Sequence, residues 1–150
     1  MQKQQAPVAR RRQARILTAQ ALYAWLLSHD DMSQILHDML AEEDCSNADT
    51  AYFREALFGV TEHHAEIEAQ LSLYVDRTVA ELDPMEHAIL LLSGFELIYR
   101  LDIPYRVVIN EGLELAKQFG ATDGHKFVNG VLDKLAQNAR ATEVQAKRNG

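Results

Sequence analysis

The stretch ELDPMEHAILLL (81–92) carries the clearest helix signal in the sequence. Asp83 is suited to the N-cap of a helix, and Pro84 to the first turn, where its missing amide hydrogen costs nothing. Glu86 stands three residues after the cap, which is the spacing of a capping box with Asp in place of Ser or Thr. The helix continues to about Arg100 with apolar residues on most faces, so we expect other elements to contact it from several sides.

Helices are also predicted on both sides of this stretch. The segment Ala14–Leu27 is apolar nearly all round, so we expect this helix to be central, and shorter helical patterns follow between residues 33 and 74. VVINEGLELAKQF (107–119) and HKFVNGVLDKLAQNA (125–139) also have helical patterns, with Asp123 as a cap for the second. No strand alternation of useful length is visible, and 7 Gly and 3 Pro are too few for a β-sandwich. The predicted fold class is all-α, with about six to seven helices and no sheet.

Charge is distributed unevenly along the chain. The sequence has 15 Lys plus Arg against 22 Asp plus Glu, a formal net charge of −7. Residues 1–29 contain five basic residues and no acid, so they carry +5 and leave −12 on the remainder. Four of the five are the arginines of ARRRQAR (9–15). A basic segment on an acidic body predicts a polyanion site at one end, although a solvated terminus has the same composition.

Length and composition favour one domain. A chain of 150 residues with 47% hydrophobic residues can bury one substantial core. The single cysteine, Cys45, cannot form an internal disulfide, and no signal peptide is visible, so we expect a cytoplasmic location. The longest apolar stretch, Ala88–Leu101, is too short and too polar to span a membrane. We expect a flexible arm over 1–9, one helical domain over 10–139 and a flexible tail over 140–150.

The sequence offers little for catalysis or metal binding. It has no Gly-rich phosphate loop, no GxSxG motif and no CxxC pair. His63 and His64 are adjacent, and neighbouring helical residues point about 100° apart, so the two are poorly placed to share one ion. No pair of acids is singled out by its surroundings. We therefore expect no enzymatic activity, no metal site and no cofactor.

Binding chemistry is better represented in HKFVNGVLDK (125–134). Phe127 stands beside Lys126 near the predicted start of a helix, where amide hydrogens favour a phosphate and an exposed ring can stack on an unpaired base. The alternative is that Phe127 is a core residue, because apolar residues follow it at helical spacing. Taken alone, Tyr23 and Tyr74 are also typical of packing residues.

Three segments together resemble the NusB family of bacterial transcription antitermination factors. They are ARRRQAR leading into AQALYAW (9–25), DIPYRVVINEGLELAKQFG (102–120) and DGHKFVNGVLDKL (123–135), within a match that runs from about Val8 to Ala136. The resemblance implies two small helical bundles packed together and a role without catalysis. It implies as partners the ribosomal protein NusE, single-stranded boxA RNA of nascent ribosomal RNA transcripts and, through other Nus factors, the RNA polymerase elongation complex.

The same resemblance implies roles for individual residues. RNA contacts are implied for the arginines around the start of the first helix and for residues at the start of the last: Arg10, Arg11, Arg12, Arg15, Asp123, Lys126 and Phe127. The arginines are expected on phosphates and Phe127 on a base, while Asp123 caps its helix or accepts a hydrogen bond from a base. Contacts to NusE are implied for three residues, Tyr23, Tyr74 and Glu86.

Two positions depart from the family pattern, and other functions stay open. Gly112 stands where alanine is expected, and a glycine inside a helix costs about 1 kcal/mol unless a close helix contact needs it. Gly124 replaces a more usual serine, which leaves the geometry around Asp123 open. The alternatives are a helical adaptor that binds protein without specific RNA recognition, and an accessory domain of an RNA methyltransferase system.

Overall fold

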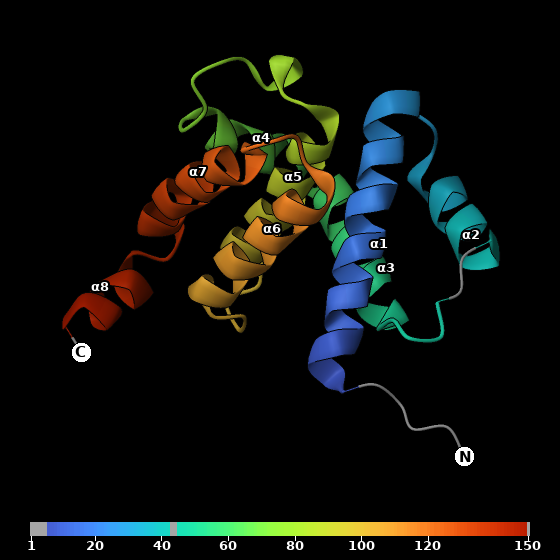
Figure 1. Ribbon diagram of the computed structural model, residues 1–150, viewed down its shortest axis with the longest axis horizontal. Helices are drawn as coiled ribbons and strands as arrows, with labels where there is room; N and C mark the ends of the chain where they lie inside the picture. The colour runs from blue at the N-terminus through green and yellow to red at the C-terminus, as the bar shows by residue number, and fades with distance from the viewer. Residues whose placement is uncertain (1–5, 43–44, 150) are drawn as a thin grey trace.

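The computed structural model describes residues 6–42 and 45–149, which form eight α-helices and one short 3-10 helix without any strand (Figure 1). The elements are, in chain order, α1 (Pro7–Ser28), α2 (Met32–Glu42), α3 (Thr50–Glu62), α4 (His64–Ser72), η1 (Val79–Glu81), α5 (Pro84–Tyr99), α6 (Tyr105–Phe119), α7 (Gly124–Ala139) and α8 (Ala141–Asn149). The all-α class is confirmed, with one α-helix more than the expected upper number.

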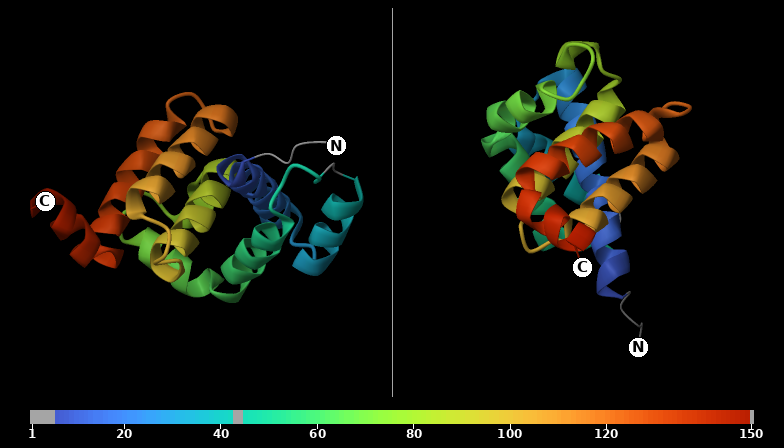
Figure 2. Two further views of the ribbon diagram at one scale, coloured as in Figure 1. Left: turned by 90° about the horizontal axis from the view of Figure 1, so that it is seen from below. Right: turned by 90° about the vertical axis from the view of Figure 1, so that its left-hand side faces the viewer.

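The helices form two packed groups around α5. One group is α1, α2 and α3, the other is α4, α6 and α7, and α5 contacts members of both. Figures 1 and 2 show α5 between the blue-to-teal helices on one side and the orange-to-red helices on the other. Leu90, Leu91 and Leu92 are consecutive and fully buried, which requires neighbours on several faces of the helix. The sequence predicted the central position for Ala14–Leu27, which lies in α1; α1 packs chiefly against α2, α3 and α5, and it is α5 that contacts members of both groups.

The start of α5 forms largely as its sequence predicts. The Asp83 side chain accepts a hydrogen bond from the Met85 amide at 2.9 Å, and Pro84 occupies the first turn. Glu86 is used differently, because its carboxylate lies against the turn between α6 and α7. A Cβ atom at Gly124 in that turn would stand 3.0 Å from the Glu86 carboxyl carbon. A tertiary contact, and not the reciprocal half of a capping box, therefore determines where this carboxylate lies.

Helix α6 approaches its neighbours closely at Gly112. A Cβ atom at this position would lie 2.7 Å from Ser93 Oγ on α5 and 3.0 Å from Leu132 Cδ1 on α7. Alanine would force these side chains to shift, so closer packing of the three helices offsets the low helix propensity of glycine. The close helix contact that the sequence left open for Gly112 is present.

The C-terminal end differs from the expected flexible tail, because Ala141–Asn149 form α8. The guanidinium of Arg140 is buried and donates to the carbonyl oxygens of Glu96, Leu97 and Arg100, at 2.7 to 3.0 Å. These carbonyls belong to the C-terminal end of α5, where a helix lacks intrahelical partners. The prediction of a disordered tail from Arg140 is wrong over these residues, because contacts between residues 40 or more apart anchor it.

The N-terminal helix begins earlier than expected. Pro7 occupies the first turn of α1, a position that suits proline. Residues 7–9 of the expected arm are therefore helical, while residues 1–5 lie outside the described residues. In the part of the chain that the structure describes, no helix is both long and apolar enough to cross a membrane.

Candidate nucleic-acid interface

The first arginine of α1 holds the segment that precedes α3. The Arg10 guanidinium donates to the carbonyl oxygens of Ser46 and Ala48, at 3.1 and 3.0 Å. The Arg10 carbonyl accepts from the Asp49 amide at 3.0 Å. A phosphate bound by Arg10 would therefore compete with backbone carbonyl oxygens for the same donors.

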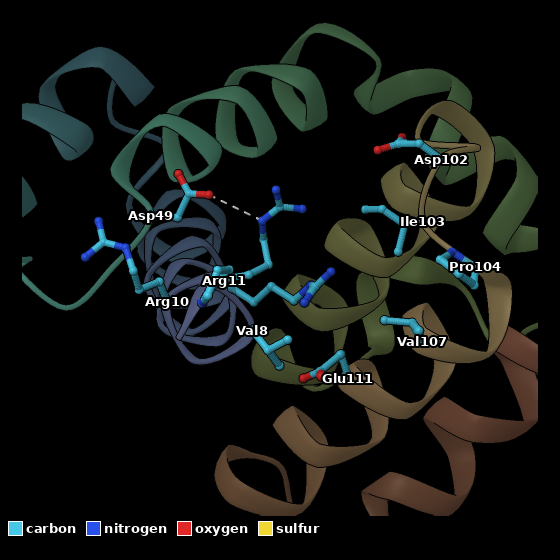
Figure 3. Close-up of a pocket in the computed structure, with 11 residues that line it drawn as sticks. Val8, Arg10, Arg11, Asp49, Asp102, Ile103, Pro104, Val107 and Glu111 are labelled. Atoms are coloured by element: carbon cyan, nitrogen blue, oxygen red, sulfur yellow. Dashed lines mark ion pairs between the residues drawn. The ribbon is translucent and has the colours of Figure 1, made fainter. Parts of the chain in front are cut away.

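Arg11 contacts the start of α3. Its guanidinium carbon stands 3.8 Å from the ring centroid of Tyr52, and its Nε lies 3.5 Å from Asp49 Oδ2, the ion pair drawn as a dashed line in Figure 3. Asp49 also caps α3 by accepting a hydrogen bond from the Tyr52 amide at 3.0 Å. Arg11 is thus held by a carboxylate and an aromatic face, each of which favours a planar cation.

Arg12 points to α6. Its Nε donates to Glu111 Oε1 at 2.9 Å, and 60% of its side chain is exposed. The hydrogen bond from Arg12 and the charge of Glu111 raise the pKa of Arg12, so this guanidinium stays positively charged. Because the side chain is largely in water, a phosphate oxygen could take the place of the Glu111 carboxylate.

A groove separates the start of α1 from the start of α6. Figure 3 shows Val8 and Val107 on its two sides, with Arg11 above and Glu111 below. Val8 and Val107 are 63% and 40% exposed, so the groove has apolar walls between charged edges. Chemically, such a groove can accept a flat apolar group while the neighbouring guanidinium groups hold an anion.

Arg15 also lines this groove, but its side chain is almost fully buried. It is 4% exposed, and its Nε donates to both oxygens of Glu96, at 3.0 and 3.2 Å, between α1 and α5. The Tyr52 hydroxyl donates to the same carboxylate. Burial and the charge of Glu96 raise the pKa of Tyr52, which keeps its hydroxyl protonated as a donor. Arg15 lies on the face of α1 that packs against α5 and forms a buried ion pair, so its phosphate contact stays a prediction that would require this ion pair to open.

The start of α7 carries the second group of predicted residues. Phe127 is half-buried against the core, and the Arg77 guanidinium carbon stands 4.9 Å from its ring centroid. Lys126 is exposed, with its Nζ 3.5 Å from Asp123 Oδ1. Asp123 has a left-handed backbone (φ 63°), and its side chain turns to Lys126 and not to the first-turn amides. The expectation that Asp123 caps α7 is wrong, because an N-cap needs extended backbone geometry.

A recess beside Phe127 brings together residues that the sequence left apart. Its polar and aromatic lining comes from the segment after α4 and from α7: Tyr74, Asp76, Lys126, Phe127, Gly130 and Lys134. The sequence analysis missed Lys134, which follows Phe127 by seven residues and so shares its helix face. It also missed Arg77, and no local signal connects Arg77 to a ring 50 residues away.

Among the residues implied for NusE, Tyr23 lies apart from the recess. It is 36% exposed on α1, seven residues after Ile16 and eleven after Arg12. Residues seven or eleven positions apart lie at nearly the same angle around an α-helix. Arg12, Ile16 and Tyr23 therefore form one stripe along α1. Ile16 and Arg12 line a recess between α1 and α6, and Tyr23 extends the same stripe beyond it.

The other two residues implied for NusE lie close to the start of α7. Glu86 is only 8% exposed beneath the turn that contains Gly124. Burial, followed by the charge of Asp83, raises the pKa of Glu86. Tyr74 lines the same recess as Phe127. The residues implied for RNA and for NusE are therefore neighbours at this end of the molecule.

The two groups of predicted RNA contacts lie at opposite ends of the molecule. Figure 1 shows the start of α1 at the bottom and the start of α7 near the top, with α6 running between them. The recess between α1 and α6 includes Arg12 on α1 and extends along α6 to Gln118, near the end of that helix. Glu111 and Glu114 line the middle of this path.

The fold and these surfaces define a class of protein: all-helical, with two helical groups around one central helix, an arginine-bearing helix start and a basic, aromatic recess. The chain belongs to the NusB family, whose model matches residues 12–137. The Pseudomonas savastanoi pv. phaseolicola protein named transcription antitermination protein NusB is 54% identical over 140 residues, which cover 93% of this chain and 85% of that protein.

Solved structures agree with this membership. T. maritima NusB matches with a TM-score of 0.79 at 28% identity, covering 91% of this chain and 94% of that one. A chain from the crystal structure of antitermination factors NusB and NusE in complex with dsRNA matches with a TM-score of 0.70. Its identity is 21%, over 84% of this chain and 95% of that one, so this likeness concerns the fold.

Proposed function

We propose that this protein is a transcription antitermination factor that binds boxA RNA in nascent transcripts together with the ribosomal protein NusE. The observation that carries the proposal is membership of the NusB family over residues 12–137, with relatives named as transcription antitermination proteins. The geometry supports it, because the start of α1 offers guanidinium groups for phosphates and the start of α7 offers Phe127 and Lys126 for a nucleotide.

On this proposal the start of α1 binds phosphates of the RNA, and the start of α7 binds a base. Arg10, Arg11 and Arg12 bind phosphates, which positions the strand, and Phe127 stacks on a base, which contributes sequence preference. A single strand along the recess between α1 and α6 would reach both ends. Because Glu111 and Glu114 line that path, electrostatic attraction is confined to the ends, and we expect modest affinity for the protein alone.

NusE pairing is the second part of the proposal, through Tyr23, Tyr74 and Glu86. The structure of similar fold solved with NusE and double-stranded RNA describes the partners of that NusB, and we propose NusE for this chain as well. The −12 charge outside residues 1–29 favours a partner with a basic surface of its own. We further propose that the pair joins the RNA polymerase elongation complex through other Nus factors on ribosomal RNA operons, in the cytoplasm and without catalysis.

A salt-dependent titration tests the proposal. Labelled boxA RNA and a scrambled RNA are titrated with wild type and with the triple variant Arg10→Ala, Arg11→Ala and Arg12→Ala, with and without NusE. We expect preferential binding of boxA that NusE tightens. The slope of log affinity against log salt should fall by about 0.7 for each phosphate contact that the variant loses. The triple variant Arg54→Ala, Lys147→Ala and Arg148→Ala, which removes three exposed positive charges on α3 and α8, is the charge-matched control.

Two results would contradict the proposal. Equal binding of boxA and scrambled RNA by the NusE pair would remove sequence-specific recognition. A triple variant that binds RNA as wild type does, with an unchanged salt slope, would show that the arginines are not phosphate contacts. If NusE pairing alone survived, the protein would be a helical protein-binding adaptor.

A further inference from the structure

Helix α6 begins without a capping side chain of its own. Pro104 stands at its N-cap position, and a proline side chain cannot accept a hydrogen bond from the first-turn amides. A residue 38 positions further along the chain takes this role, because Glu143 on α8 accepts from the Tyr105 amide at 2.8 Å. Its negative charge also suits the positive end of the α6 dipole. The start of α6 therefore depends on α8 for its cap.

The same carboxylate is joined to the end of α5 through Arg140. The other oxygen of Glu143 accepts from Arg140 Nη1 at 2.7 Å, while the remaining Arg140 nitrogens donate to three carbonyl oxygens at the end of α5. Burial opposes ionisation of Glu143, but the hydrogen bonds from the Tyr105 amide and from Arg140 outweigh it and lower the pKa of Glu143. Arg140 and Glu143 form what we call the C-terminal clamp, which holds both ends of the α5–α6 turn (residues 100–104).

The turn that the C-terminal clamp holds forms one wall of the groove beside the α1 arginines. Residues 102–104 line that groove across from Val8 (Figure 3). The Ile103 amide donates to the Arg100 carbonyl oxygen at 3.0 Å, and Arg140 donates to the same oxygen at 2.7 Å. The clamp is therefore only one hydrogen-bonded atom away from the wall of the groove.

Other contacts of the turn are weaker than the C-terminal clamp. The Arg100 side chain pairs with Asp102 and with Glu55 of α3, at 3.0 and 2.9 Å. Both carboxylates are more than half exposed, so these ion pairs contribute little to stability. The Arg140 side chain is only 3% exposed, and hydrogen bonds of a buried charged group are costly to lose. The buried clamp, more than the surface ion pairs, therefore determines where the turn lies.

We infer that Arg140 and Glu143 are positioning residues for RNA, which hold the α5–α6 turn as a fixed wall of the groove without contacting the RNA themselves. The inference rests on the proposed function, and it adds residues beyond position 137, where the match to the family model ends. A wall that is already fixed has less conformational freedom to lose when RNA binds, which raises affinity without any new contact.

The test removes the cap from α6 and compares the effect with an equal loss of charge. Glu143→Ala and its control Glu62→Ala each remove one carboxylate, and Glu62 is exposed on α3. Both variants are titrated with boxA RNA after circular dichroism has verified the fold. Loss of an acid by itself should tighten RNA binding slightly. We expect Glu143→Ala to weaken binding about five- to tenfold instead, as when the binding-competent turn is populated about a tenth to a fifth of the time.

Three further measurements separate positioning from direct contact and from general stability. The slope of log affinity against log salt should stay as in wild type, because no phosphate contact is lost. Hydrogen exchange of the amides of residues 101–108 should become faster in Glu143→Ala, while NusE pairing stays unchanged. Glu143→Gln keeps one oxygen acceptor in place of two, so its RNA affinity should fall between those of wild type and Glu143→Ala.

The outcomes distinguish this inference from the proposed function. If wild type prefers boxA and Glu143→Ala binds it as tightly as Glu62→Ala does, the inference is overturned and the proposed function stands. Equal losses of RNA binding and NusE pairing in Glu143→Ala would also overturn it, because the effect would then be general. If Glu143→Ala does not fold, Glu143→Asp, which keeps the charge on a shorter side chain, replaces it with the same expected loss. If wild type shows no preference for boxA even with NusE, the proposed function fails first and the inference fails with it.

Discussion

The starts of α1 and α7 both carry positive charge, but they hold it in different ways. Arg11 and Arg12 are paired with carboxylates from other helical regions, Asp49 and Glu111, at 3.5 and 2.9 Å. Lys126 is exposed, and its acid neighbour comes from the adjacent turn. At α1 a phosphate must therefore compete with acids from distant parts of the chain, whereas at α7 the competing acid is local and the half-buried Phe127 ring, with Arg77 over it, lines a recess.

We therefore expect the start of α1 to contribute electrostatic attraction, and the start of α7 to recognise the shape of a base. Substitutions at the start of α1 should change salt dependence more than base preference. Substitutions at the start of α7 should change base-dependent affinity more than salt dependence. Each prediction below tests one side of this comparison.

The largest effect is expected at Arg15. It is the buried arginine of the run at residues 9–15, whereas Arg12 is exposed. Arg15→Ala should lower the free energy of unfolding by about 3–5 kcal/mol, because it leaves the Glu96 carboxylate buried without its cation. Urea denaturation measures the change. Arg12→Ala, which removes an exposed arginine of the same helix, should leave the urea midpoint nearly unchanged. Equal midpoints for the two variants would place Arg15 on the surface after all.

The next largest effect is expected at Phe127. Phe127→Ala should weaken binding of boxA RNA by about tenfold to a hundredfold through loss of a stacked base. Fluorescence anisotropy measures the RNA affinity, and calorimetry measures NusE pairing, which we expect to be retained. Phe58→Ala, at a partly exposed phenylalanine on α3, is the matched control. A similar loss in both variants would point to general destabilisation and not to stacking.

A smaller gain is expected when the competing acid at α1 is removed. Glu111→Gln releases Arg12 from its hydrogen-bonded ion pair, so RNA binding at low salt should tighten by about two- to fivefold. Glu62→Gln makes the same charge change on an exposed residue of α3 and controls for net charge. Titrations at two salt concentrations measure the effect. A tightening of equal size in both variants would mean that overall charge, and not the local competition, limits binding at α1.

The smallest effect is a pH dependence at the α7 end. Burial raises the pKa of Glu86, so ionising this carboxyl is less favourable in the folded chain than in the unfolded chain. Its contribution to stability is full below the unfolded pKa and is lost as the pH rises through the folded pKa. The unfolding free energy of wild type relative to Glu86→Gln should therefore fall as the pH rises through the raised pKa of Glu86. Urea melts at several pH values check the sign, and a difference that rises with pH would refute the shifted pKa.

Local signals in the sequence were sufficient for most of the helices. Asp83 and Pro84 start α5 as predicted, and the continuous apolar residues that follow are buried on several faces. Three local predictions failed: the cap at Asp123, the disordered tail after Arg140 and the reciprocal half of the capping box at Glu86. In each case a particular backbone turn, a long-range hydrogen bond or a tertiary contact, none of them visible in local composition, decided the outcome.

The candidate site was predictable only in part. The arginine run and the HKFVNG motif located both ends of the proposed RNA path, because residue types and spacing alone carry that resemblance. The sequence could not tell that Arg15 turns inward while Arg12, three residues earlier, turns to the surface. Nor could it bring Arg77 onto the Phe127 ring, because the two residues meet only after α4 and α7 have packed.

By itself the sequence determined that this protein is helical, where most of its helices lie, and which family the chain resembles. Caps, prolines and apolar periodicity act over a few residues, so they can be read without a structure. Only the tertiary structure decided which positive charges are paired, where the Glu86 carboxylate lies and which residues surround the recess at Gly130. The physical reason is that burial and charge pairing depend on neighbours from distant positions in the chain, and these meet only when the helices pack around α5.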